Sequence, residues 1–196
     1  MSNNIDKQLM YFRLSLQYLH LVEAVIDESI KQGNQQVVIS DSSISESDFY
    51  EKTKWSDFNI AEPTLFNLYH GIELLLKGYL KSCNTNVTSQ GHKIDNLFSS
   101  FQNNFSDKKS IAEALKKYIG SNSELVEPLK SFFYENNITV SQYYDALRYP
   151  TDKKEIITYS HYTLKGKGEK VIPFFKELRA DIDFILRESV KYWRNL

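Results

Sequence analysis

Apolar residues recur at helical spacing along most of the chain, and they are densest between residues 60 and 82. On a helical wheel they cover most of the circumference, which predicts a central helix buried on most sides. The apolar positions are Leu65, Leu68, Tyr69, Ile72, Leu74, Leu75, Leu76, Tyr79 and Leu80. Pro63 fits the first turn, where a missing N–H costs little, and the Ser-, Thr- and Asn-rich run 82–91 predicts the end of the helix.

Two further long helices are predicted, at residues 4–32 and at about 169–194. The first of them has two apolar stripes, so it requires two neighbours. Its second stripe consists of Tyr11, Leu14, Tyr18, Leu21, Val22 and Val25. Either both stripes contact helices of the same bundle, or the second stripe contacts another subunit, because long terminal helices commonly form symmetric dimers.

Shorter helices are predicted at 92–105, at 106–120, from Asn122 or Ser123 onward, and at 139–147. Pro150 ends the last of these, since the residue before a proline avoids the helical region. The β-forming run 154–165 predicts an extended loop or a short hairpin. The fold class is therefore all-α, an up-and-down helical bundle of five to seven helices in one domain spanning 1–196.

The segment 33–59 interrupts the helical pattern and is acidic. Its charged residues between 41 and 57 are Asp41, Glu46, Asp48, Glu51 and Asp57 against Lys52 and Lys54. Val37, Val38 and Ile39 fit a short strand. A connection of this length in a compact domain is either a functional loop or a mobile one.

Composition narrows the class of protein. Hydrophobic residues make up 41% and charged residues 25% of the 196 residues, as in ordinary soluble domains. The formal net charge of −1 gives no overall attraction to nucleic acid or anionic membrane, so such a partner requires a local patch. No secretory signal or membrane span is predicted. The single cysteine, Cys83, excludes a disulfide within the chain and fits the cytoplasm.

Four polar residues form one strip along the central helix: His70, Glu73, Lys77 and Lys81. Their spacing of three or four residues places them on the same face. This strip is either a solvated face with a Glu73–Lys77 ion pair or the lining of a cleft. A metal site on His70, Glu73 and His92 lacks a supporting His-x-x-x-His or Cys pair, so no metal or other cofactor is predicted.

Three short motifs in this order resemble the HEPN domains of bacteria and archaea. They are Tyr69-His70-Gly71-Ile72-Glu73-Leu74-Leu75-Leu76-Lys77, then Gly91-His92-Lys93-Ile94, then Leu147-Arg148-Tyr149-Pro150 before a long final helix. The resemblance covers about residues 60–195. It implies a helical bundle that usually dimerises. It also implies a role in toxin–antitoxin or phage-defence systems, where many members are metal-independent ribonucleases and others bind nucleotides or act as scaffolds.

The nuclease members of that family use an Arg followed, after four to six residues, by a His. A guanidinium can hold the scissile phosphate while an imidazole moves a proton on or off the ribose 2′-OH. Arg148 stands where that Arg would, but the window after it holds no His, and the next one is His161. Alternatively, Arg148 pairs with a carboxylate such as Glu73 or Asp145, and His92 satisfies backbone groups around the Gly91 turn.

The stretch from Arg148 to Lys170 combines positive charge with tyrosines. Tyr149, Lys153 and Lys154 follow Arg148 closely, and such a mixture suits single-stranded RNA or a nucleotide because lysines contact phosphates and rings stack on bases. A solvated loop of mixed charge is the other interpretation.

Together these features predict a HEPN-like homodimer that binds RNA, a nucleotide or a cognate protein, such as an antitoxin or a nucleotidyltransferase-like partner. Glu73, Lys77, His70, His92, Tyr149, Lys153 and Lys154 are the expected ligand-binding residues. The first alternative is a metal-independent ribonuclease with Arg148 and a non-standard His, His161 or His92. The second is a dimeric scaffold without a small ligand.

Overall fold

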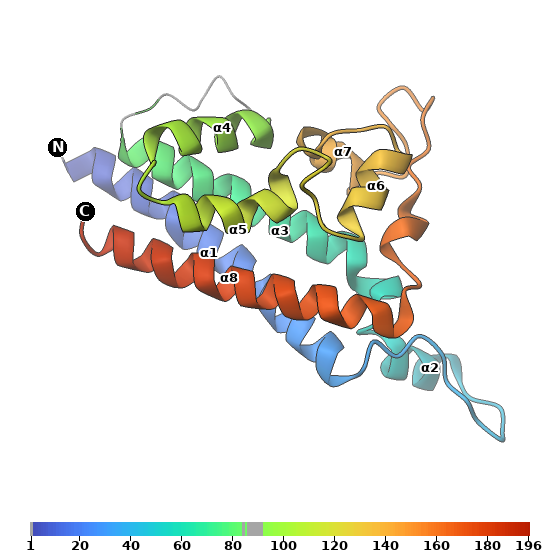
Figure 1. The fold of residues 1–196 in the computed structure, drawn as a ribbon. Coiled ribbons are helices and arrows are strands. Elements are labelled where there is room, and N and C mark those ends of the chain that lie inside the picture. Colours follow the sequence, from blue (N-terminus) through green and yellow to red (C-terminus); the bar gives the residue numbers. More distant parts are fainter. Residues whose placement is uncertain (1, 84, 86–91) are drawn as a thin grey trace.

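The chain forms a bundle of helices in which three long helices run side by side (Figure 1). The computed structural model describes the backbone of residues 2–83, 85 and 92–196, with side chains from Gln8 onward. Its α-helices are α1 (Ser2–Lys31), α2 (Glu46–Thr53), α3 (Asp57–Ser82), α4 (Ile94–Asn104), α5 (Lys109–Ile119), α6 (Leu129–Glu135), α7 (Tyr143–Ala146) and α8 (Val171–Trp193). Short 3₁₀ turns occupy Val140–Gln142, His161–Leu164 and Gly168–Lys170.

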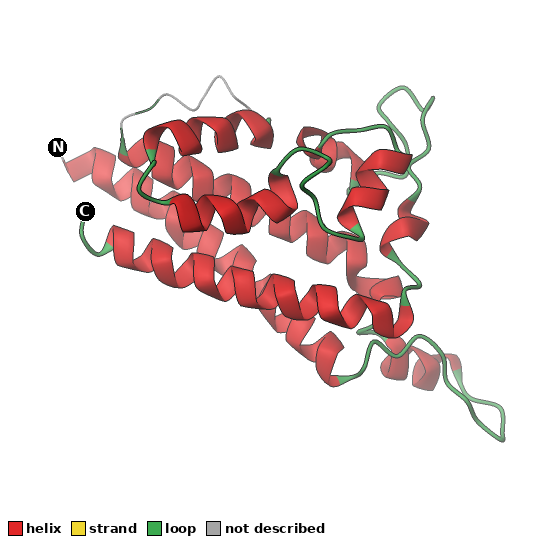
Figure 2. Cartoon of the chain, viewed as in Figure 1, coloured by secondary structure: helices red, strands yellow, loops and turns green. Residues whose placement is uncertain are grey.

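Within the described residues the secondary structure is helical, and the predicted all-α bundle is confirmed (Figure 2). The stretch 154–160 is a loop, in which Thr158 forms one isolated antiparallel bridge with Thr151, and the 3₁₀ turn His161–Leu164 follows it. Val37, Val38 and Ile39 form no strand, so that prediction is wrong; three β-forming residues without a partner strand cannot satisfy their backbone groups.

Helix α3 is the centre of the bundle, as its sequence predicts. Two of its glycines, Gly71 and Gly78, lie seven residues apart and face α1. A Cβ at Gly78 would lie 2.9 Å from the ring of Phe12, and one at Gly71 would lie 2.9 Å from the side chain of Leu19. The two helices therefore approach more closely than larger residues would allow, and Ser15 of α1 donates a hydrogen bond of 2.8 Å to the Gly71 carbonyl.

The prediction that Pro63 lies in the first turn is wrong. Helix α3 begins at Asp57, which places Pro63 inside the helix. The earlier start has a physical cause in a buried cluster. Asp57 is fully buried, its backbone N–H donates to Asn34 Oδ1 at 2.6 Å, and its carboxylate accepts from Gln36 Nε2 at 2.6 Å and from the Lys167 backbone N–H at 2.9 Å.

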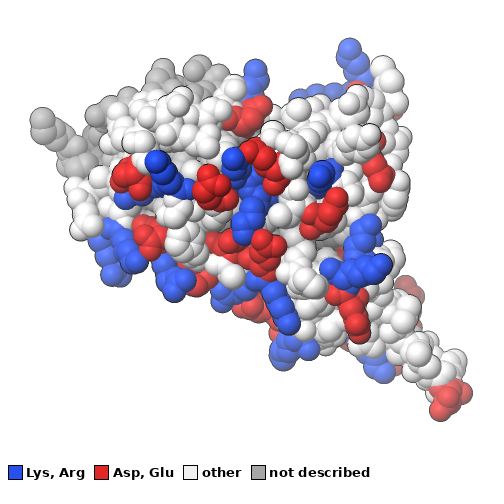
Figure 3. All heavy atoms as spheres, in the orientation of Figure 1, with Lys and Arg blue, Asp and Glu red and all other residues white. Residues whose placement is uncertain are grey.

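Helix α4 packs on α3, α5 packs on α4 and α8, and α6 and α7 close one end of the bundle (Figure 1). Acidic and basic side chains alternate over the face formed by α5 and α8 (Figure 3). Lys117 of α5, for example, lies 2.8 Å from Glu177 and 2.6 Å from Asp181 of α8. Charges of both signs thus neutralise one another on this face, in keeping with the net charge near zero.

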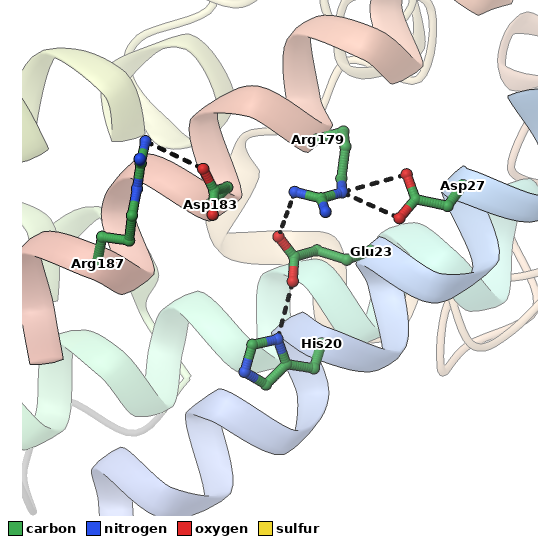
Figure 4. A network of polar contacts seen from close by, with 6 residues as sticks. All are labelled: His20, Glu23, Asp27, Arg179, Asp183 and Arg187. Atoms are coloured by element: carbon green, nitrogen blue, oxygen red, sulfur yellow. Dashed lines mark hydrogen bonds and ion pairs between the residues drawn. The ribbon is translucent and has the colours of Figure 1, made fainter.

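An ion network joins α1 to α8 on another side (Figure 4). Arg179 of α8 donates to both carboxylate oxygens of Asp27 and, at 2.9 Å, to the buried Glu23 of α1. The other oxygen of Glu23 contacts His20 Nδ1 at 2.8 Å. Because Arg179 holds two acidic residues one helical turn apart, it fixes the register of α1 against α8.

Helix α1 buries its first stripe and leaves part of its second stripe exposed. Phe12, Leu19 and Ile26 are in the core, whereas Leu14 and Leu21 remain exposed. Along part of its length, the second stripe therefore has no neighbour among the described residues.

Candidate functional site

The candidate site is built around Glu73, a carboxylate that α3 holds inside the bundle. Glu73 is only 1% exposed, so the expectation of a solvated Glu73 face is wrong. Lys77, one turn later on α3, lies with its Nζ 2.6 Å from Glu73 Oε1 and is itself mostly buried. A buried charge is stable only when it is paired and hydrogen-bonded, and Glu73 meets this requirement with three different partners.

His92 is the second partner of Glu73. Its Nδ1 lies 3.1 Å from each carboxylate oxygen, and its ring stacks on Tyr144 with centroids 4.2 Å apart. A carboxylate only accepts hydrogen bonds, so Nδ1 carries the proton and Nε2 is left with its lone pair in the neutral ring. The imidazole is 49% exposed, and it is thus oriented by a buried acid while remaining open to solvent.

Tyr143 and Tyr144 are the first two residues of the short helix α7, and their side chains contact Glu73 and His92, respectively. A capping box formed by Thr139 and Gln142 fixes the turn before them. Tyr143 is buried, and its O–H donates a short hydrogen bond to Glu73 Oε2. Tyr144 is partly exposed and supports the His92 ring.

The protonation states follow from these contacts. Burial alone would raise the pKa of Glu73, but the hydrogen bonds from Lys77, Tyr143 and His92 outweigh it and hold the pKa below its usual range. Burial, together with the neighbouring Glu73 carboxylate, raises the pKa of Tyr143. Glu73 is therefore ionised and Tyr143 is a hydrogen-bond donor at neutral pH.

Arg148 follows α7 and is exposed. Its guanidinium carbon lies 4.5 Å from the ring centroid of Tyr144, 5.0 Å from that of Tyr149 and 5.8 Å from that of Phe66. No carboxylate pairs with Arg148 among the described residues, so the expected pairing with Glu73 or Asp145 is wrong. Asp145 instead lies 3.5 Å from Lys153. The guanidinium thus packs on aromatic rings and has no carboxylate partner in the described part of the chain.

Arg148 and His92 both contact the Tyr144 ring. The His92 ring centroid and the Arg148 guanidinium carbon therefore lie no farther apart than the sum of 4.2 Å and 4.5 Å. The structure thus places the His92 imidazole and the Arg148 guanidinium on one aromatic residue, although they lie 56 positions apart in the sequence.

His70 borders this cluster on α3. Its ring is parallel to Phe66 and packs edge-on against Tyr18 of α1. Burial lowers the pKa of His70, and its Nδ1 is buried without a hydrogen-bond partner among the described residues. His70 is a neutral wall of the site rather than a charged ligand.

His161 and the basic loop lie apart from Glu73. His161 Nε2 donates to the Ala146 carbonyl at 2.6 Å, and its ring packs near Phe132 and Tyr159. Lys153 and Lys154 are exposed on the loop closed by the Thr151–Thr158 bridge. Of the predicted ligand-binding residues, Lys77 and His92 both contact Glu73, and Tyr149 contacts Arg148.

Sequence reasoning missed the aromatic residues that hold the site together. Tyr143, Tyr144 and Phe66 fit the apolar stripes of their segments, so their spacing indicates core packing alone. The contact of His92 with Glu73 was also missed. The expected role of His92 at the Gly91 turn stays a prediction, because Gly91 lies outside the described residues.

Comparison of the chain with protein-family models, curated proteins and solved structures finds no match. Among the described residues, no group of three or more His, Cys, Asp or Glu side chains could hold a metal ion. None of the described helices contains an apolar stretch long enough to cross a bilayer.

Proposed function

We propose that this chain is a HEPN-like protein of a defence or toxin–antitoxin type system that binds the phosphate of RNA or of a nucleotide at Arg148. The observation that supports the proposal is the exposed Arg148 guanidinium, which is held by aromatic rings and lacks a carboxylate partner in the described part of the chain. An unpaired guanidinium offers two parallel N–H donors to a phosphate, and the interaction is stronger than that of a neutral hydrogen bond.

The surroundings of Arg148 suit a nucleotide better than a free phosphate ion. Tyr149 is 44% exposed beside the guanidinium and offers a ring face on which a base can stack. Lys153 and Lys154 lie exposed on the following loop, within reach of a further phosphate on a longer chain. In this proposal, binding requires no cleavage.

Fluorescence anisotropy with a labelled single-stranded RNA tests the proposal. Arg148→Ala is expected to raise Kd about tenfold or more. It should also reduce the slope of log Kd against the logarithm of the salt concentration by about one. Arg148→Lys keeps the charge but not the planar stacking group, so its Kd should lie between those of wild type and Arg148→Ala. The matched control is Arg187→Ala, since Arg187 is an exposed arginine that already pairs with Asp183 at 3.0 Å. Equal affinity for wild type and Arg148→Ala would refute the proposal.

A metal-independent ribonuclease is the second candidate, and the Glu73–His92 pair favours it. With Nδ1 held by Glu73, the free Nε2 of His92 is a proton acceptor, as needed to deprotonate a ribose 2′-OH for attack on the adjacent phosphate. Arg148, on the same Tyr144 ring, would hold that phosphate. In this arrangement His92 takes the role for which the family motif uses a His after the Arg, and His161 is not required.

Cleavage of RNA in the presence of EDTA distinguishes the two candidates. If the chain is a nuclease, His92→Ala removes cleavage and RNA binding persists, and a 2′-deoxy nucleotide at the cleaved position is resistant. His20→Ala is the matched control because His20 also contacts a glutamate through Nδ1, at 2.8 Å, but belongs to the network on α1. Intact RNA with every variant leaves binding alone as the function.

A further inference from the structure

The acidic segment between α1 and α3 projects from the bundle as an arm, defined here as residues 35–52 (Figure 1). Nearly all of its side chains are exposed, including Phe49 at 42% and Tyr50 at 57%. It contains the short helix α2, whose N-terminus is capped by the Ser45 side chain at the Asp48 N–H. A helix of eight residues is only marginally stable by itself in water. The short length of α2 and its two exposed aromatic rings therefore indicate that this helix packs against a partner.

One face of α2 combines acid and aromatic character. Glu46, Phe49 and Tyr50 have the spacing i, i+3 and i+4 and therefore share a face. The arm as a whole carries four acidic residues, Asp41, Glu46, Asp48 and Glu51, against the single base Lys52. Glu51 pairs with Lys54, whereas Asp41 and Glu46 form no ion pair with another described residue. A complementary surface must therefore be apolar and rimmed by positive charge.

Such a surface lies between α1 and α3. A groove of about 680 Å³ has Met10, Leu14 and Leu74 as its main apolar residues and Arg13 and Lys81 at its rim. The lining contains no acidic residue, and neither Arg13 nor Lys81 pairs with a carboxylate in the part of the chain that the structure describes. Met10 is 65% and Leu14 41% exposed, so the apolar floor is open to solvent.

The arm lies apart from this groove within its own chain. The groove lies near the N-terminal end of α1 and the arm leaves from the other end (Figure 1). The 17 residues from Leu14 to Lys31 correspond to roughly 25 Å of helix at 1.5 Å per residue. Between the two, the same α1–α3 face continues into a smaller hollow lined by Leu21, Val25 and Trp55, and Trp55 lies three residues after the arm.

We propose that two copies of this chain pair along their α1–α3 faces in antiparallel orientation, and that the arm of each copy docks in the groove of the other. In this arrangement Phe49 and Tyr50 fill the apolar floor, and Glu46 approaches Arg13 or Lys81 of the second copy. An antiparallel pairing about a twofold axis makes the exchange reciprocal, so that both grooves are filled and the contact closes at a dimer.

Disulfide cross-linking tests the exchange. In a Cys83→Ser background, Tyr50→Cys and Leu14→Cys are introduced into separate chains that carry tags of different length. The two proteins are then mixed under mild oxidation. We expect a cross-linked product that contains one chain of each kind. Tyr134→Cys is the matched control for Tyr50→Cys, because Tyr134 is a more exposed tyrosine on α6 that is not part of the arm; it should give no product with Leu14→Cys.

A charge exchange between the arm and the groove provides a second test. By light scattering, wild type should have twice the chain mass of 22.9 kDa, whereas Glu46→Arg and the double variant Arg13→Glu/Lys81→Glu should each be monomeric with unchanged helical content. An equimolar mixture of the two should restore a dimer, since opposite charges then face each other in both exchanged contacts. A monomeric wild type, or a dimer that cross-links Leu14→Cys only to itself, would overturn the proposal.

Discussion

His92 Nδ1 lies 3.1 Å from both carboxylate oxygens of Glu73, although the two residues belong to different elements of the chain. The contact fixes the tautomer of an exposed imidazole through a buried acid. It also connects the segment before α4 to the centre of α3, while Tyr143 connects α7 to the same carboxylate. Glu73 is thus the point at which three separate segments meet.

Replacing Glu73 by Gln is expected to destabilise the fold and to change its pH dependence. At pH 7 the variant should lose about 3 kcal/mol, because Lys77 and His92 lose their ionised partner inside the bundle. The pKa of Glu73 is lowered in the folded state, so its contribution is present above the unfolded-state value of about 4.3 and is lost as the pH falls below it. Urea unfolding at a series of pH values should therefore show the difference from wild type narrowing as the pH falls from about 5 toward 3.

Glu188→Gln is the control for that measurement. Glu188 also pairs with a lysine, Lys191 at 2.6 Å, but on the exposed surface of α8, where solvent screens the pair. Its stability should be nearly that of wild type at every pH. A Glu73→Gln variant that loses the same stability at low as at neutral pH would show that the loss comes from packing and not from ionisation.

Removing the Tyr144 ring should weaken ligand binding through both of its neighbours. Tyr144→Ala takes away the surface on which His92 and Arg148 rest, and we expect Kd for single-stranded RNA to rise roughly threefold to tenfold. Tyr144→Phe keeps the ring and should bind like wild type. Anisotropy titrations of the two variants side by side give the answer, and equal weakening in both would assign the effect to the hydroxyl.

The two glycines of α3 predict an order of stability. Gly78→Ala gains about 1 kcal/mol of helix propensity but pushes a methyl group into the buried ring of Phe12, at a cost of about 1–3 kcal/mol. Gly71→Ala meets the flexible end of Leu19 instead, which can move more easily. Chemical denaturation should rank wild type and Gly71→Ala above Gly78→Ala. If Gly78→Ala is the most stable of the three, the close approach of α1 and α3 is not as described.

The sequence predicts the bundle well because its helices are long and their apolar periodicity is strong. It predicts less of the site, because the partners of Glu73 are not local. His92 lies 19 residues and Tyr143 lies 70 residues away from it, and no spacing rule connects them. The spacing of the charged residues on α3 fits a solvent-exposed face as well as a buried hydrogen-bonded cluster. The short helix α2 escaped prediction for a different reason, since eight residues contain too few turns for a periodic signal.

Asn34 and Asp57, which flank the arm, are tied to each other by the hydrogen bond between Asn34 Oδ1 and the Asp57 backbone N–H. This hydrogen bond closes the bundle at the base of the intervening segment. Chain entropy makes the cost of changing its length small, since doubling a flexible loop adds only about 0.6 kcal/mol. The position between these two residues is thus a natural point of insertion, where a peptide of different length or specificity could be grafted without reworking the helices beneath it.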